Sequence, residues 1–267
     1  MLRSAVFIFL ALTRCIAAQN DTNLTTSSVQ EAFSNAKIVP DVLPSFQPTA
    51  LLNVTFTDQA TGALLSVSPG MNLTMEQTML EPTFAVTANS SDSLAEQIFV
   101  LAIVDPDAPT PQNTSISQFR HMLAGDLHVN ASSGGALVNS SAALTDFVNP
   151  TPPAGSDPHR YVILLFTQPP TFNVTASTLV NASTPRTNFN LTAFGQAVGL
   201  GSPVAGNFFF TGPSDSTGTT SGSGSAPAPT TSDTGSSSSG ASAVEKLVPV
   251  GGIWTVFMGA IAISYFL

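Results

Sequence analysis

The segment that decides the fold is IFVLAIVDPDAPTPQ, residues 98–112. Its first seven residues, Ile98 to Val104, form an apolar run rich in β-branched side chains, which is typical of a buried strand. The run stops at Asp105 and Asp107, which a proline separates, and a second proline follows two residues later. Proline fixes φ and biases the residue before it toward extended conformations. We therefore predict a stiff loop that presents two carboxylates at the end of a buried strand. The plain alternative is a simple turn.

Other segments share the composition of this strand and predict a mainly β domain. Three are rich in Val, Ile, Phe and Thr and bounded by turn-forming residues: 51–57, 81–88 and 161–167. Two segments favour helices: 28–36 and 190–199. This pattern predicts a β-sandwich-like domain with peripheral helices.

The domain is expected over residues 34–211, preceded by an N-terminal extension over residues 19–33. A chain of this length can build one ordinary hydrophobic core. The single cysteine, Cys15, lies before the expected start of the mature protein. We therefore expect no disulfide in the domain, although the expected route is oxidising.

The N-terminus predicts a secretory signal peptide over residues 1–18. Arg3 forms a short positive region, an apolar stretch follows, and Ala18 is a small residue at the expected cut. Gln19 then starts the mature chain. The alternative is a membrane anchor, for which the apolar stretch is short.

The C-terminus predicts attachment to a membrane through a GPI anchor. Residues 212–243 consist almost entirely of Ser, Thr, Gly, Pro and Ala, and we expect an extended O-glycosylated stalk. Residues 244–267 end in an uncharged apolar tail. Small residues, a polar spacer and a terminal apolar tail form the GPI signal, with attachment expected near the end of the stalk. A single transmembrane helix is the alternative, but no basic residue follows the tail.

Eleven N-x-S/T sequons support the secretory route, since each is a glycosylation acceptor only where it is exposed. They are Asn20, Asn23, Asn53, Asn72, Asn89, Asn113, Asn130, Asn139, Asn173, Asn181 and Asn190. We expect the protein at the extracellular face of the plasma membrane or in the cell wall, which would suit a fungal cell surface.

The chain is acidic, with a formal net charge of −9 and only seven lysine and arginine residues. This charge argues against nucleic acid and against anionic bilayers as general partners. The scarce basic residues gather in two motifs. Arg120 and His121 are adjacent in FRHML, and His159, Arg160 and Tyr161 are adjacent in DPHRY.

Together with the D-P-D-A-P loop, these motifs describe a small site for an anion. Histidine and tyrosine donate hydrogen bonds to phosphate oxygens, and a nearby carboxylate raises the pKa of a histidine and strengthens that donation. The carboxylates orient an imidazole or accept from a ligand ammonium. We predict binding of a head group that bears phosphate or carboxylate.

Other chemistries are not favoured by the sequence. The Asp and His spacing matches no common metal template. The serines lie in no nucleophile elbow such as G-x-S-x-G. We predict a non-enzymatic protein without cofactor or metal, and we interpret the third histidine, His128, as a surface residue.

Several separated motifs resemble those of the phosphatidylethanolamine-binding protein family. They are AKIVPDVLPSF (36–46), DPDAP (105–109), RHML (120–123), PPAGSDPHRYVILLF (152–166) and GLGSPVAGNFF (199–209). The resemblance implies an antiparallel β-sandwich with flanking helices and a small anion pocket at one end. Carried over by position, it places six residues in that pocket: Asp105, Asp107, His121, Pro153, His159 and Tyr161.

The sequence departs from the family pattern at three places. Phe119 stands where many relatives have tryptophan, and Arg120 where many have a second histidine. Arg120 would make the pocket more anion-selective if it pointed inward, but strand alternation favours an outward, solvated charge. Residues 156–158 predict a longer or differently bent loop before His159.

Three functions follow. The leading hypothesis is a cell-surface protein that binds an anionic head group of the phosphate or phosphatidylethanolamine type. The alternative is an inhibitor of a protease such as a serine carboxypeptidase, as the resemblance implies for some relatives. The third is a structural wall glycoprotein, which would bind no saturable ligand.

Overall fold

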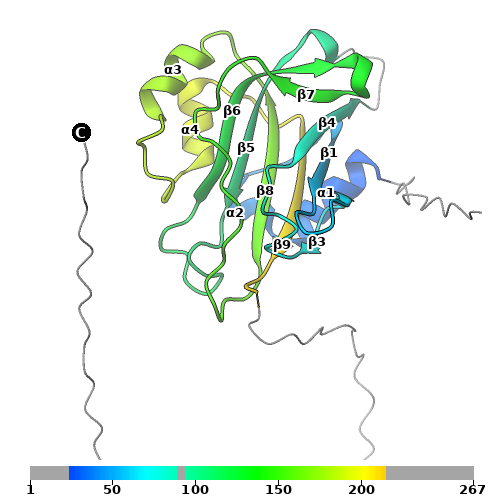
Figure 1. Cartoon of the computed structure of the whole chain (residues 1–267). Coiled ribbons are helices and arrows are strands. Elements are labelled where there is room, and N and C mark those ends of the chain that lie inside the picture. Colours follow the sequence, from blue (N-terminus) through cyan, green and yellow to red (C-terminus); the bar gives the residue numbers. More distant parts are fainter. Residues whose placement is uncertain (1–23, 89–93, 215–267) are drawn as a thin grey trace, which may run out of the picture. The chain divides into compact units, whose positions relative to one another are not determined.

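The computed structural model describes residues 24–88 and 94–214 (Figure 1). The strands are β1 Ala50–Thr57, β2 Leu64–Ser66, β3 Met71–Leu73, β4 Thr83–Ala88, β5 Ile98–Asp105, β6 Phe119–Asn130, β7 Ala136–Asn139, β8 His159–Thr167 and β9 Ala205–Thr211. The helices are α1 Thr26–Asn35, α2 Ile38–Asp41, α3 Phe172–Leu179 and α4 Leu191–Val198, with short 3₁₀ helices at Leu94–Glu96 and Ala131–Ser133.

All the strands of the described residues belong to one sheet, in the order β2-β1-β4-β7-β6-β5-β8-β9-β3. Each neighbouring pair is antiparallel except β3 and β9, which pair in parallel. The sheet curls so that β1 also lies against β9. The predicted mainly β, antiparallel fold is confirmed, with one curled sheet forming both layers.

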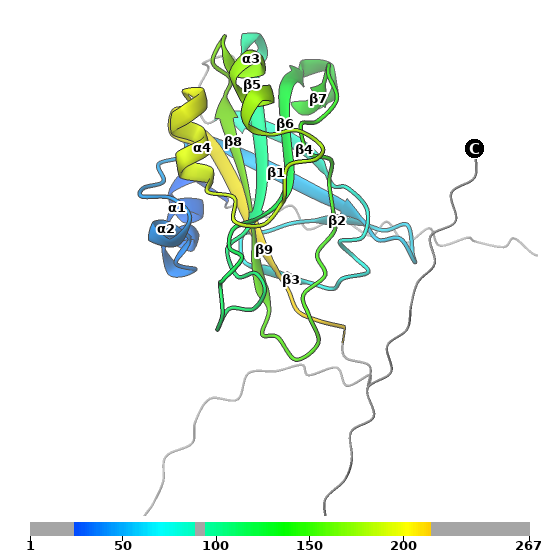
Figure 2. The ribbon, with the colours of Figure 1, turned by 90° about the vertical axis from the view of Figure 1, so that its left-hand side faces the viewer.

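The curled sheet encloses an inner core, and the helices cover its other face to form an outer core. Strand β5 contributes side chains to both cores. Leu101 and Ile103 face the inner core, whereas Ala102 and Val104 face the outer core. Figure 2 shows α1, α2 and α4 on one side of β8 and β9, with β1 on the other. Because β5 is buried on both faces, its sequence is an uninterrupted apolar run.

The four predicted strands and both predicted helices are present, with ends shifted by a few residues. The other elements were not predicted, namely helices α2 and α3 and strands β2, β3, β6, β7 and β9. Polar and charged residues interrupt the apolar pattern of β6, and the β-branched residues of α3 lower its helix propensity. Tertiary packing decides these elements, since Phe172 and Ala176 of α3 are buried in the outer core.

The packed structure begins before residue 34, where the sequence placed the start of the domain. Helix α1 starts after Thr25, which forms a capping box with Ser28. Its Val29 and Phe33 are four residues apart, so both face the outer core, where they are buried. Phe33 stacks on Phe46 with ring centroids 4.1 Å apart. The extension over residues 19–33 therefore contributes to the fold.

The terminal predictions concern residues outside the described ranges. The signal peptide, all but the first three residues of the stalk, and the GPI signal lie in residues 1–23 and 215–267. Within residues 24–88 and 94–214, no helix is both long and apolar enough to cross a bilayer.

The packing of α1 gives a first prediction. Phe33→Ala removes a fully buried ring, and we expect it to lower the free energy of unfolding by about 3–5 kcal/mol. Urea denaturation of the purified protein measures this. Gln30→Ala, at an exposed position of the same helix, is the control and should change stability by less than about 0.5 kcal/mol. Similar values for the two variants would show that α1 does not belong to the core.

Candidate functional site

The site begins where β5 and β8 end side by side. Asp105 closes β5 and His159 opens β8, and both side chains face inward because they continue the inner alternation of their strands. The Nδ1 atom of His159 lies 2.8 Å from Oδ2 of Asp105, and both residues are buried. Since a carboxylate only accepts, Nδ1 is the donor. The other oxygen of Asp105 accepts from the backbone N–H of Asp107 at 2.7 Å.

His121 reaches the same place because β6 contains a bulge. Ile103 pairs with Met122, and Val104 pairs with Arg120, so His121 is an extra residue without a partner on β5. A bulge re-aims a side chain and interrupts the alternation. His121 and Met122 therefore both face inward, whereas Arg120 faces the outer core.

Tyr161 follows His159 by two residues on the inner face of β8. Its ring stacks on Phe209 and meets His121 edge-on, with centroids 5.2 and 5.0 Å away. Burial, together with the charges of Asp105 and Asp107, raises the pKa of Tyr161, so the hydroxyl stays protonated and can donate. Within the described chain, this hydroxyl makes no hydrogen bond to another residue.

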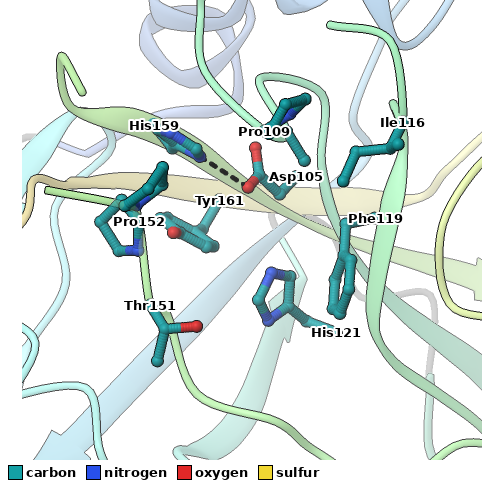
Figure 3. Close-up of a pocket in the computed structure, with 11 residues that line it drawn as sticks. Asp105, Pro109, Ile116, Phe119, His121, Thr151, Pro152, His159 and Tyr161 are labelled. Carbon is teal, nitrogen blue, oxygen red and sulfur yellow. Dashed lines mark hydrogen bonds and ion pairs between the residues drawn. The ribbon is translucent and has the colours of Figure 1, made fainter. Parts of the chain in front are cut away.

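These groups line one cavity of about 270 Å³ (Figure 3). Its lining consists of Asp105, Ala108, Pro109, Ile116, Phe119, His121, Thr151, Pro152, Pro153, His159 and Tyr161. Five of the six predicted site residues thus lie together, and Asp107 does not. The prolines and Phe119 supply apolar walls around a few polar groups, as is usual for small-ligand sites.

His121 offers a hydrogen-bond acceptor to the cavity. Its Nδ1 lies 2.7 Å from the backbone oxygen of Val148, which can only accept, so Nδ1 carries the proton. Burial lowers the pKa of His121 and outweighs the opposing effects of the Val148 carbonyl and Asp105. The ring is therefore neutral near pH 7, and its Nε2 atom offers a lone pair without a partner among the described residues. The predicted role of His121 as a donor does not fit this state.

The second ring nitrogen of His159 is already in use. Nε2 lies 2.9 Å from Oγ of Ser156, and that hydroxyl donates to the backbone oxygen of Asp157 at 2.8 Å. Both ring nitrogens of His159 therefore have partners in the described chain, Asp105 at Nδ1 and Ser156 at Nε2. The loop before His159 is thus bent back onto the ring. Sequence reasoning marked this loop as unusual but missed Ser156, because no local pattern shows where a loop hydroxyl reaches.

Asp107 faces away from the cavity, which corrects the predicted ligand role. Its carboxylate accepts from the backbone N, Nε and Nη2 of Arg160, at 2.8, 3.0 and 2.7 Å. Arg160 lies on the opposite face of β8 from His159 and Tyr161, so Asp107 is drawn to the outer side. Arg160 also pairs with Asp41 at 2.8 Å. Burial alone would lower the pKa of Arg160, but the bonds and charges of Asp107 and Asp41 raise it.

Arg120 corrects a second expectation, since it is neither in the cavity nor solvated. It faces outward as alternation predicts, but only 1% of its surface is exposed. The segment that precedes α4 covers it, and the guanidinium lies 4.8 Å from the ring centroid of Phe189. His128 is only half-buried and lies near Ser140, so it is outside the cavity as expected. In the described ranges, no group of three or more metal-ligating side chains could hold a metal.

The comparisons with known proteins agree with this geometry. A sequence profile described as phosphatidylethanolamine-binding protein matches residues 44–209. The chain belongs to the phosphatidylethanolamine-binding protein family. This confirms the family that the separated motifs indicated.

Two relatives and one solved structure are similar to this chain. The chain is 33% identical over 178 residues to the "26 kDa secreted antigen" of Toxocara canis, covering 66% of this chain and 62% of that protein. It is 30% identical over 164 residues to the "Carboxypeptidase Y inhibitor" of Saccharomyces cerevisiae, covering 52% of this chain and 73% of the inhibitor. A crystal structure of carboxypeptidase Y inhibitor complexed with its cognate proteinase has a TM-score of 0.60 at 25% identity, covering 70% of this chain and 96% of that one.

The ion pairs of Arg160 give a second prediction for this family member. Asp107→Asn removes the charge of a buried carboxylate and leaves the guanidinium poorly compensated, so we expect a loss of about 3 kcal/mol in unfolding free energy. Asp41→Asn alters the pair whose carboxylate is 43% exposed, and should cost about 1 kcal/mol or less. Urea denaturation compares them. Equal losses would contradict the assignment of Asp107 as the main anchor of Arg160.

His121 gives a third prediction, about pH. The pKa of an unfolded histidine is about 6.5, and the folded value is lower. Below pH 6.5 the unfolded chain therefore binds more protons, and stability falls as the pH falls. The contribution is fully present above about pH 6.5 and is lost with a slope of at most about 1.4 kcal/mol per pH unit.

The matched variant is His121→Asn, which can keep a donor to the Val148 carbonyl but does not titrate. Unfolding free energies measured from pH 5 to 7.5 should fall more steeply for the parent protein than for this variant. Parallel curves would show that His121 is not held neutral by burial.

Proposed function

We propose that the protein binds the head group of a phosphate monoester, or phosphate itself, in the cavity between Asp105, His121, His159 and Tyr161. The observation that carries this proposal is a pair of polar atoms without partners in the described chain. The hydroxyl of Tyr161 can donate and Nε2 of His121 can accept, and both residues line the same small cavity. Neither atom is among the fully buried side-chain atoms of the described residues that lack a partner, so both are open to the cavity. A few convergent polar groups in a mainly apolar cavity are usual for a ligand site.

The two groups also describe the protonation state of the ligand. A monoanionic phosphate has oxygens that accept from Tyr161 and one P–OH that donates to His121. A dianionic phosphate could bind instead if His121 took up a proton. The total charge of ligand and histidine would then be the same. The Nε2 atom of His159 becomes available to the ligand when the ligand displaces Ser156.

The size of the cavity limits the ligand to a head group. Its volume of about 270 Å³ lies just below the range for drug-sized ligands, which is about 300 to 1,000 Å³. Diacyl chains would have to remain outside. Phosphorylethanolamine is the matching probe, because it carries the phosphate monoester head group without acyl chains.

Tyr161→Phe is the sharpest test and gives a fourth prediction. It removes the donor but keeps the ring that stacks on Phe209, and it leaves no polar atom unpaired in the free protein. We expect affinity for phosphorylethanolamine and inorganic phosphate to fall by about ten- to a hundredfold. This is the usual effect of losing one hydrogen bond to a charged group. Melting temperature without ligand should not fall. A thermal-shift titration measures both effects.

Two further measurements sharpen this test. His159→Ala should also abolish the ligand-dependent rise in melting temperature. Sulfate at pH 7 has no proton to donate to His121, so it should bind more weakly than phosphate. Unchanged phosphate binding in both Tyr161→Phe and His159→Ala would refute the pocket.

Protease inhibition is a second candidate, supported by the likeness to carboxypeptidase Y inhibitor. A protease contacts a surface, so inhibition need not depend on a small cavity. Assaying carboxypeptidase Y with the parent protein and with Tyr161→Phe separates the functions. Inhibition retained in the variant supports an interface outside the pocket, and absence of inhibition removes this candidate. Absence of both activities would favour the structural wall glycoprotein.

We also propose secretion and attachment through a GPI anchor, which the terminal segments of the sequence and the likeness to a secreted antigen support. Of the sequons, Asn53, Asn72, Asn113, Asn139, Asn173, Asn181 and Asn190 are exposed, as glycosylation requires, and Asn130 is half-buried. Asn20, Asn23 and Asn89 lie outside the described residues. Phosphatidylinositol-specific phospholipase C should release the protein from cells, and failure to do so would favour a transmembrane anchor.

A further inference from the structure

A second cavity, which we call the α4 groove, lies on the outer side of β6. It has a volume of about 660 Å³ and is lined by residues from the end of α3, the following segment and α4. Its apolar wall consists of Leu179, Val180, Phe189, Ala193, Phe194 and Ala197. Leu179 remains 44% exposed at this groove. Arg120 lines the groove as its one charged residue among the described ones.

Arg120 is a buried cation without a carboxylate partner. Its Nε donates to Oγ1 of Thr145 at 2.8 Å, and its Nη2 donates to the backbone oxygen of Thr184 at 3.1 Å. Both acceptors are neutral. No described residue accepts from Nη1, and none of the ion pairs of the described chain includes Arg120.

The other two arginines of the described residues show how unusual this environment is. Arg160 has two carboxylate partners, Asp107 and Asp41. Arg186 lies close to Arg120 and hydrogen-bonds only to backbone oxygens, so it adds positive charge. Burial lowers the pKa of Arg120, and the positive charge of Arg186 lowers it further. A buried charge without a counter-charge is costly, and an anion bound beside it removes part of that cost.

We propose that the α4 groove binds a single-chain amphiphile whose anionic head contacts Arg120 and whose apolar chain lies along Phe189, Phe194 and α4. A guanidinium recognises both carboxylate and phosphate oxygens. The groove has the volume of an ordinary small-molecule site and combines one cation with a mainly apolar wall. This site is separate from the cavity of the proposed function, because Arg120 and His121 face opposite sides of β6.

The probes are decanoate, decyl phosphate and the uncharged 1-decanol. They are titrated by calorimetry into the full-length protein after enzymatic removal of N-glycans, because the sequon at Asn190 lies at the groove. We expect saturable binding of at least one charged probe, with decanol at least about tenfold weaker. The stronger of the two charged probes identifies the head group. Absence of saturable binding by both charged probes at millimolar concentration would overturn the proposal.

Ala197 offers a matched pair of variants that spares the buried arginine. It is exposed on α4 and lines the groove, and both glutamate and glutamine are good helix formers. Ala197→Glu places a negative charge in the groove and should weaken binding of the charged probe about tenfold or more. Ala197→Gln adds similar volume without charge and should change the affinity for the charged probe by no more than about threefold. Equal losses in the two variants would show that charge recognition is absent.

Two more variants locate the binding. Arg120→Gln should abolish the preference for the charged probe over decanol, and thermal melting reports whether this variant folds. Tyr161→Phe, in the other cavity, should bind the charged probe with unchanged affinity. Loss of binding in Tyr161→Phe would assign the amphiphile to the inner cavity and refute the α4 groove. Each result is independent of whether phosphate binds near His159.

Discussion

The ion pair between half-buried Arg160 and buried Asp107 is the interaction on which the arrangement of the site depends. Three bonds from Arg160 hold Asp107, and the loop after β5 is thereby attached to the start of β8. Asp105, two residues earlier, then meets His159 at 2.8 Å. Arg160 also donates to Asp41 and to the backbone oxygen of Ala36. One side chain therefore joins the first helices, the D-P-D-A-P loop and the strand that carries two cavity residues.

Adjacent residues of one strand serve different sites because their side chains point to opposite faces of the sheet. On β8, alternation sends His159 and Tyr161 inward and Arg160 outward. On β6, the bulge adds a residue, so that His121 joins Met122 on the inner face while Arg120 faces the helices. Without the bulge, the period of two could not place both His121 and Met122 inward. The mainly apolar strands thus place polar groups at defined positions at the ends of a mainly apolar core.

The inner cavity and the α4 groove share one physical property: each contains polar or charged groups that the protein itself does not satisfy. In the inner cavity these are the hydroxyl of Tyr161 and Nε2 of His121. In the groove it is the guanidinium of Arg120. A buried charge that lacks a counter-charge is costly. A ligand that supplies the missing partners finds them already oriented, so it loses little of its binding energy to ordering the protein.

The sequence by itself determined the mainly β fold, the family and five of the eleven residues that line the cavity. It could do so because a strand buried on both faces needs an unbroken apolar run, and because scarce His, Arg and Tyr residues stand out in an acidic chain. Its separate motifs also indicated which strand ends meet. Only the tertiary structure decided the direction of each side chain. Asp107 belongs to Arg160, Arg120 is buried beneath Phe189, and Ser156 bonds to His159, because these contacts join segments whose distance in space no local pattern encodes. The protonation of His121 was decided in the same way, since burial and the Val148 carbonyl set it and neither is visible in the FRHML motif.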